Sequence, residues 1–139
     1  MFINIWSVLI ATVAQFIIGT VWYMPLFGKM WGKIHGFDTY SPDSQQEMRK
    51  KMMPLLVVQF IGTLVTTVVL AIFITWLPLN WNVYALAGFF WIGFVVPTQV
   101  SAVIFGGTKP EWMLTKIAIM AGAALVELEV AGIIIKMML

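Results

Sequence analysis

Residues 52–108 read MMPLLVVQFIGTLVTTVVLAIFITWLPLNWNVYALAGFFWIGFVVPTQVSAVIFGGT and contain no Asp, Glu, Lys, Arg or His. A transmembrane helix needs ~20 mainly apolar residues, so this stretch is long enough for two spans and the turn between them. Residues 1–28 form a second uncharged stretch, which predicts another span, and a further apolar stretch follows Trp112. The pattern predicts a protein that crosses the bilayer four times.

The composition excludes several classes of protein. Charged residues make up 10% of the chain and hydrophobic residues 61%, whereas a soluble domain has about 25% charged residues. There is no cysteine and one histidine, His35, so a disulfide, a thiolate nucleophile and a Cys- or His-rich metal site are excluded. We therefore expect no catalytic residues, no metal and no other cofactor.

We expect one all-α transmembrane domain over residues 1–139, folded as a four-helix bundle, because open sheets cannot cross lipid. The predicted spans are about residues 3–23, 55–76, 83–105 and 112–136. Pro25 and Gly28 should end the first span. Ser41-Pro42-Asp43 should start a helix that Pro54 kinks as it enters the membrane. A tight turn is expected at residues 78–82. The first segment lacks the basic leader of a signal peptide, so we expect it to be a retained helix.

The basic residues predict the orientation. The loop at residues 26–53 carries Lys29, Lys33 and Arg49-Lys50-Lys51, and the loop between spans three and four carries Lys109. Because Lys and Arg favour the cytoplasmic side, loops one and three should lie in the cytoplasm and both termini outside. We expect an integral protein of the cytoplasmic (inner) membrane. This placement also accounts for the basic charge without a nucleic-acid partner.

Small and polar residues predict the packing faces, since they let membrane helices approach closely. In the first span Ser7, Ala11, Gln15 and Gly19 recur every four residues. The fourth span carries Gly122, Glu129 and Gly132 on one stripe, among other small or polar residues. Glu127 lies about 200° away from Glu129, on a more apolar stripe. We therefore expect Glu129 at a helix contact and Glu127 at lipid, water or a partner subunit.

The candidate intramembrane polar site comprises Glu129, Glu127, Gln15, Gln59 and Gln99. A carboxyl within the bilayer is costly unless it is paired, hydrated or protonated, and it often carries protons or cations. The alternative is structural: the acids hydrogen-bond with the glutamines, which hold helices together.

The segment GTVWYMPLFGKMWGK, residues 19–33, predicts an interfacial anchor. Pro25 and Gly28 favour a turn, and a surface helix is plausible over residues 27–36. Aromatic rings suit the headgroup layer, and lysines there can meet lipid phosphates. The predicted anchor residues are Trp22, Tyr23, Phe27, Lys29, Trp31 and Lys33. A substrate-binding role is the alternative.

This segment resembles the signature G-x-x-W-Y-x-P-x-x-F-G-K-x-W of the membrane family called domain of unknown function 1761, with one residue fewer between Pro25 and Phe27. The resemblance continues at Asn4, at Trp91-Ile92-Gly93-Phe94 and at Phe105, and so covers nearly the whole chain. It implies a four-helix integral membrane protein and no particular mechanism.

Three functional classes remain to be compared. An enzyme is least supported, because no nucleophile–base pair or phosphate-binding glycine loop is recognisable. We favour a structural or accessory membrane subunit that acts through helix packing, as a homo-oligomer or within a larger membrane complex. The alternative is an oligomeric small-solute or proton-linked transporter or channel that uses an intramembrane Glu.

Overall fold

The computed structural model describes residues 2–76 and 82–139, so most of the turn predicted at residues 78–82 lies outside the described residues. All regular structure in the described ranges is helical. Within them, four helical segments are long and apolar enough to cross a membrane: Ile5–Leu26, Pro42–Trp76, Val83–Phe105 and Pro110–Met137. The prediction of an all-α chain with four candidate spans is confirmed.

The first span continues past its proline, contrary to the sequence prediction. Helix α1 (Ile5–Val21) is followed by the π-helical turn η1 (Trp22–Leu26), which contains Pro25. The Phe27 N–H donates to the Trp22 carbonyl at 2.9 Å. This wider spacing carries the helix across Pro25, which has no N–H to donate.

The third span also contains a π-helical turn, but in its middle rather than at its end. It consists of α4 (Val83–Phe90), the π-helical turn η3 (Trp91–Val95) and α5 (Val96–Phe105). Pro97 lies two residues after the π-helical turn, within α5, whereas Pro25 lies inside its π-helical turn. Each π-helical turn begins with a tryptophan, Trp22 in the first span and Trp91 in the third.

Helix α3 (Pro42–Trp76) is one helix of 35 residues that includes Pro54. The backbone N–H of Ser44 donates to the Ser41 hydroxyl oxygen at 3.3 Å, which confirms the predicted helix start. Residues 42–53 of the predicted cytoplasmic loop are therefore the first part of α3, as the predicted helix start implies. The part of this loop before α3 holds α2 (Gly28–Ile34), which is the predicted short helix, and the 3-10 turn η2 (Phe37–Thr39).

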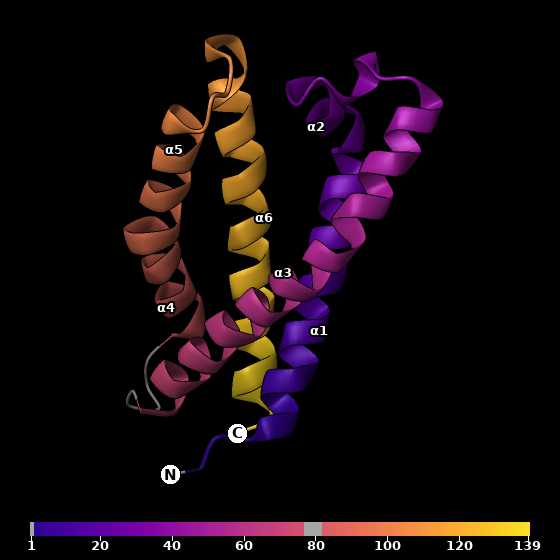
Figure 1. Cartoon of the computed structure of the whole chain (residues 1–139). Helices are drawn as coiled ribbons and strands as arrows, with labels where there is room; N and C mark the ends of the chain where they lie inside the picture. The colour runs from indigo at the N-terminus through magenta and orange to yellow at the C-terminus, as the bar shows by residue number, and fades with distance from the viewer. Residues whose placement is uncertain (1, 77–81) are drawn as a thin grey trace.

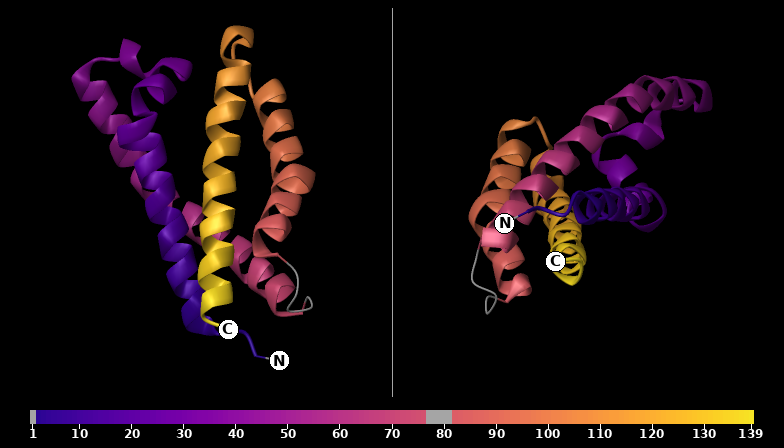
Figure 2. Two further views of the ribbon diagram at one scale, coloured as in Figure 1. Left: turned by 180° about the vertical axis from the view of Figure 1, so that it is seen from behind. Right: turned by 90° about the horizontal axis from the view of Figure 1, so that it is seen from below.

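Helix α6 (Pro110–Met137) lies at the centre of the bundle. Figures 1 and 2 show α1 on one side of it and α4 and α5 on the other, with α3 crossing obliquely near the end that carries the termini. Because neighbours approach α6 from several directions, much of its circumference is a packing surface. Its buried residues are Ile119, Ala121, Ala123, Leu128, Ala131, Gly132 and Ile135.

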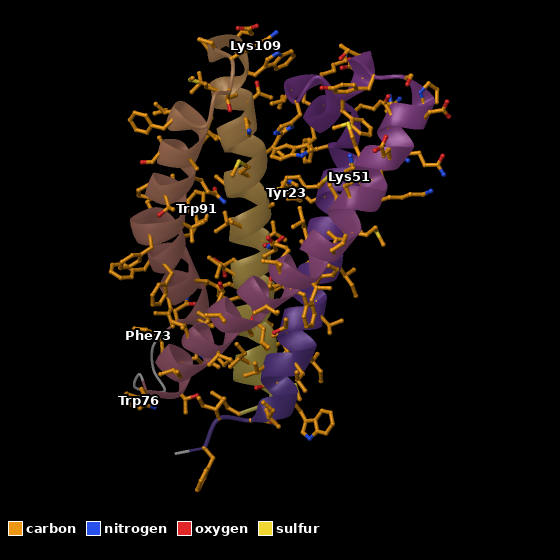
Figure 3. The ribbon with its side chains drawn as sticks, viewed as in Figure 1. Tyr23, Lys51, Phe73, Trp76, Trp91 and Lys109 are labelled. Atoms are coloured by element: carbon orange, nitrogen blue, oxygen red, sulfur yellow. The ribbon has the colours of Figure 1, made fainter. Side chains whose placement is uncertain are left out.

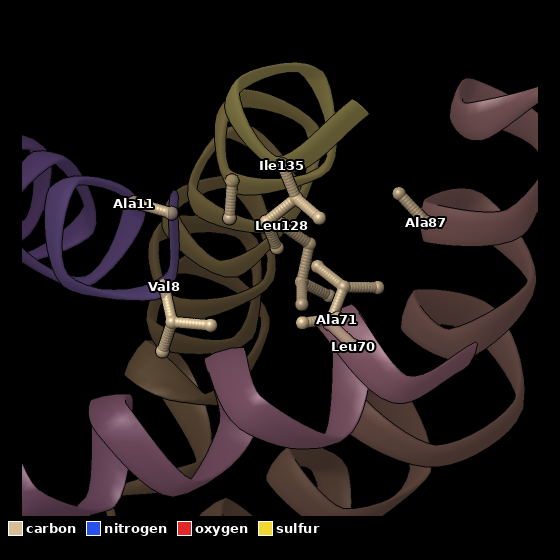
Figure 4. Packing of buried hydrophobic residues seen from close by; sticks show 8 residues of the cluster. Val8, Ala11, Leu70, Ala71, Ala87, Leu128 and Ile135 are labelled. Carbon is tan, nitrogen blue, oxygen red and sulfur yellow. The ribbon is translucent and has the colours of Figure 1, made fainter. Parts of the chain in front are cut away.

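The core of the bundle depends on small residues (Figure 4). Ala11, Ala71, Ala87 and Ala131 have no exposed surface, and each comes from a different helix. They cluster with Val8, Leu70, Leu128 and Ile135. Lipid tails are as apolar as these side chains, so close van der Waals packing between backbones, rather than exclusion of water, holds this core together.

The two ends of the molecule differ in charge. Both termini lie at one end, and α2 and the loop before α6 lie at the other (Figure 1). Lys51 and Lys109 lie toward that second end (Figure 3), and α2 adds Lys29 and Lys33 there. Large apolar side chains are exposed between the ends, for example Ile17, Val58 and Phe94. This distribution is the one expected of a bundle surrounded by lipid.

Candidate functional site

Glu127 lies in a row of residues that packs against α1. Ile119, Ala123, Ala131 and Ile135 are buried on α6 and recur every four residues, and Glu127 is the polar member of this row. On α1, Ser7, Ala11 and Gln15 are buried, and Gly19 continues their four-residue spacing. Rows with this spacing are the ridges through which helices commonly interlock. The small-residue stripe predicted on the first span is therefore a packing face.

The Glu127 carboxyl lies directly against Gly19. A Cβ atom added at Gly19 would be 2.9 Å from Glu127 Oε1, so only glycine leaves room for this oxygen in its present position. Gln15 of α1 and Tyr23 of η1 each lie four residues from Gly19 in the sequence. Tyr23 is within electrostatic range of the Glu127 carboxyl. Tyr23 is thus a polar side chain of the first span that interacts with Glu127.

The prediction that Glu127 faces away from the bundle is wrong. The small-residue stripe would be the only inner face of the fourth span if its neighbours packed on one side alone. In the structure α1 packs on one side of α6, and α4 and α5 pack on the other. Gly122 lies against Trp22 and Gly132 against Val83, so even the predicted stripe divides between two neighbours.

Glu129 is partly buried on another side of α6. Its Oε2 atom is buried and has no hydrogen-bond partner among the described residues. The predicted pairing of either acid with Gln15, Gln59 or Gln99 does not occur within those residues. The structure therefore separates the two acids, and only Glu127 is placed against a glycine of α1.

The three glutamines have different surroundings. Gln15 is buried, and its amide donates to the Thr67 hydroxyl oxygen at 2.6 Å, which joins α1 to α3. Gln99 donates to the Met120 carbonyl at 3.4 Å, which joins α5 to α6, and its Oε1 is buried without a partner among the described residues. Gln59 is exposed and donates only to Thr63 on its own helix. The predicted polar site is therefore not one cluster.

Three side chains from different parts of the bundle donate to consecutive carbonyls of α6. Trp22 Nε1 donates to the carbonyl of Ile119 at 3.0 Å, and Trp91 Nε1 donates to that of Ala121 at 2.8 Å. Gln99 donates to the carbonyl of Met120 between them. Trp91 extends from its own span toward α6 in Figure 3. We call Trp22, Trp91 and Gln99 the donor triad.

The sequence did not predict the donor triad. Trp22 was expected at headgroup level, but its indole N–H is used about 14 Å along α6 from Pro110. Trp91 belongs to a segment of the family resemblance, which predicts no hydrogen bond for it. The available signal was its position in the middle of a predicted span, where an indole N–H cannot reach water and must find a protein acceptor.

The remaining anchor residues gather around α2. The Tyr23 and Trp31 rings are 4.8 Å apart and meet edge to face, and the Trp22 and Phe27 rings are 5.1 Å apart. Lys116 of α6 lies over the Trp31 ring at 5.7 Å and donates to the Thr108 hydroxyl at 3.2 Å. Lys29 and Lys33 belong to α2 itself. These contacts attach α2 to one end of the bundle.

Comparison with known proteins agrees with the motif. The family model described as a protein of unknown function (DUF1761) matches residues 6–136. The chain belongs to this family. No curated protein matches the chain, and no solved structure matches it either. Membership in DUF1761 confirms the resemblance seen at residues 19–33 and adds no activity.

Proton exchange and hydrogen bonding are the chemistry that the polar side chains of the bundle described above can supply. No group of three or more His, Cys, Asp or Glu residues that could hold a metal ion occurs in the described part of the chain. Glu127 can exchange a proton, and the Gln15 and Tyr23 side chains on the facing row can form hydrogen bonds. Glu127 is therefore the strongest candidate for a functional residue.

Proposed function

We propose that this DUF1761 protein is a structural or accessory subunit of a membrane assembly, that it acts through helix packing, and that it has no enzymatic activity of its own. The donor triad is the observation that carries the proposal. It uses three polar side chains of two spans to fasten them to α6. Gln15 fastens α1 to α3 in the same way. The polar groups with hydrogen-bond partners between spans thus serve to hold the bundle together.

The proposed setting is the cytoplasmic membrane, with α2 and the loop before α6 in the cytoplasm and both termini outside. The basic residues near α2 and at Lys109 support this orientation through the preference of Lys and Arg for the cytoplasmic side. The proposed assembly is a homo-oligomer or a larger membrane complex.

The mass of the assembly tests this function. The chain should be extracted from its native membrane with a mild detergent and sized on a native gel against membrane-protein standards, one chain having a mass of 15.6 kDa. We expect it to migrate as an assembly larger than one chain in its detergent belt. Migration as a monomer under conditions that preserve known complexes of the same membrane would contradict the proposal.

Glu127 favours a second candidate function, proton-linked transport. Its carboxyl lies at the contact between α1 and α6 and has no hydrogen-bond partner among the described residues. An acid inside a membrane domain often marks a proton or ion pathway. Proton flux should be measured in vesicles that hold a pH-sensitive dye, with Glu127→Gln and Glu129→Gln as a matched pair. If Glu127 carries the proton, the unchanged protein should show flux that Glu127→Gln abolishes and Glu129→Gln does not. Flux through the unchanged protein equal to that of empty vesicles would reject proton-linked transport.

A further inference from the structure

The outer surface of α3 carries polar and small residues that no part of the chain covers. Met52, Leu55, Gln59, Gly62, Thr66 and Val69 follow one another at alternating spacings of three and four residues, and all six are exposed. Alternation of three and four residues is the spacing at which two helices wind around each other. We call these six residues the α3 seam.

Gln59 is the first indication that a protein partner covers the seam. It lies eight residues beyond Lys51, about 12 Å along the helix and within the apolar part of the span. Its amide donates only to Thr63 of its own helix, at the long distance of 3.5 Å, and Gln59 Oε1 accepts no hydrogen bond from the described residues. Lipid tails offer no donor, so this amide is costly when the chain is alone in a bilayer.

Gly62 is an independent second indication. A Cβ atom added there would meet nothing within 4 Å, so no intrachain contact requires a glycine. Glycine is the least favoured residue within a helix after proline. Gly19, Gly122 and Gly132 each lie against a side chain of another helix, whereas Gly88 and Gly93 of the third span have open space as Gly62 does. A glycine beside Gln59 on an exposed face is explained if another backbone approaches it closely from outside the chain.

We propose that the α3 seam binds the α3 seam of a second copy of this chain in a symmetric, parallel dimer. Around a two-fold axis normal to the membrane, Gln59 of each copy would donate to Gln59 Oε1 of the other, so one contact satisfies both amides. A primary amide is self-complementary in this way, whereas the Thr66 hydroxyl is already used, since it donates to the Gly62 carbonyl. The inference rests on the proposed function and specifies its partner.

The ends of the seam are compatible with two parallel copies. Lys51 lies just before the seam and forms an ion pair with Glu47 at 2.9 Å. This pairing reduces the repulsion between the basic ends of two α3 helices at the same membrane depth. Phe60 is the neighbour of Gln59 in sequence and packs edge to face with Phe16 of α1, so α1 covers a different side of α3.

Disulfide cross-linking locates the contact. The chain has no cysteine, so each introduced cysteine is a single thiol. Thr66→Cys places the thiol on the seam. Val57→Cys places it about 160° away from Gln59 around the helix. Each purified variant should be placed in phosphatidylcholine–phosphatidylglycerol vesicles and oxidised with copper phenanthroline. We expect a covalent dimer from Thr66→Cys and little from Val57→Cys. Equal yields, or dimer from Val57→Cys alone, would overturn the proposal.

Association measured by energy transfer between labelled copies tests the individual residues. Gln59→Leu should raise the dissociation constant in the bilayer about 5-fold to 30-fold. Gly62→Leu should raise it at least as much, and Val57→Leu should leave it unchanged. Neither seam variant removes a contact between helices of one chain, so unchanged circular dichroism will exclude misfolding. Unchanged association of both seam variants would overturn the proposal.

The outcome also separates this inference from the proposed function. Purified chains that remain monomeric in vesicles, although the native-membrane extract contains a larger assembly, would reject the seam dimer and leave the proposed function intact. Monomers in both preparations would reject both. A dimer in vesicles whose association depends on Gln59 and Gly62 supports the seam.

Discussion

Replacing Gly122 with alanine tests whether the Trp22 indole is held tightly against α6. The new Cβ would lie 2.9 Å from Trp22 Cζ2, whereas ordinary contacts are 3.4–4 Å. The indole must therefore withdraw by about 0.5–1 Å. Its hydrogen bond to the Ile119 carbonyl, now 3.0 Å, would then stretch to the limit of a hydrogen bond.

The expected loss of stability follows from three contributions. Inserting a methyl group into a packed contact costs about 1–3 kcal/mol. Losing one hydrogen bond between membrane helices costs about 0.6 kcal/mol. Alanine favours a helix over glycine by about 0.5–1 kcal/mol, which offsets part of this cost. We expect Gly122→Ala to lower the free energy of unfolding by about 1–3 kcal/mol.

The assay is equilibrium unfolding in bicelles, with Gly88→Ala as the matched control. A Cβ atom at Gly88 would meet nothing within 4 Å, so this variant should be neutral or slightly stabilising. A double variant with Trp22→Phe removes the ring atom that clashes, and it should cost less than the sum of its single changes. If Gly122→Ala is as stable as Gly88→Ala, the indole is not confined as the structure indicates.

Three further predictions use the same protein. Gln15→Leu removes the hydrogen bond to Thr67 and should destabilise the bundle by about 1 kcal/mol, whereas Gln59→Leu should not affect unfolding of the monomer. Equal effects of the two variants on unfolding would contradict the different surroundings of the two amides. Trp91→Phe removes the donor to the Ala121 carbonyl and should cost about 0.6–1.5 kcal/mol in the same assay, and a variant of unchanged stability would show that this bond contributes nothing. Thr39→Cys and Leu139→Cys should react with an impermeant thiol reagent from opposite sides of the membrane, and labelling from one side alone would refute the four-span topology.

The positions of the spans could be predicted from the sequence because the membrane imposes a length and excludes charge. The third span was predicted at residues 83–105, and its helical segments cover these same residues. The continuation of helix through Pro54 was expected, but its continuation through Pro25 could not be predicted in the same way. A proline usually ends a helix in water, and a π-helical turn that absorbs one gives no periodic signal.

The orientation of the two acids was harder to predict. A stripe of small residues identifies a packing face only if a helix has one such face, and α6 has neighbours on opposite sides. The sequence contains the row that packs against α1, which is Ile119, Ala123, Glu127, Ala131 and Ile135. Its two isoleucines and its glutamate are not small residues, so the row does not match the pattern expected of a packing face. The choice between the rows depended on where α1 packs, and that contact lies between segments about a hundred residues apart.

The central position of α6 has a consequence for biosynthesis. A ribosome makes the chain from its N-terminus, so α1, α3 and the third span are synthesised before the helix that all three contact. Until residues 119–121 enter the bilayer, the indole N–H groups of Trp22 and Trp91 lack the acceptors to which they donate in the finished bundle. Retention of the nascent chain by the insertion machinery, or by a chaperone that supplies hydrogen-bond acceptors, would protect these groups until α6 arrives.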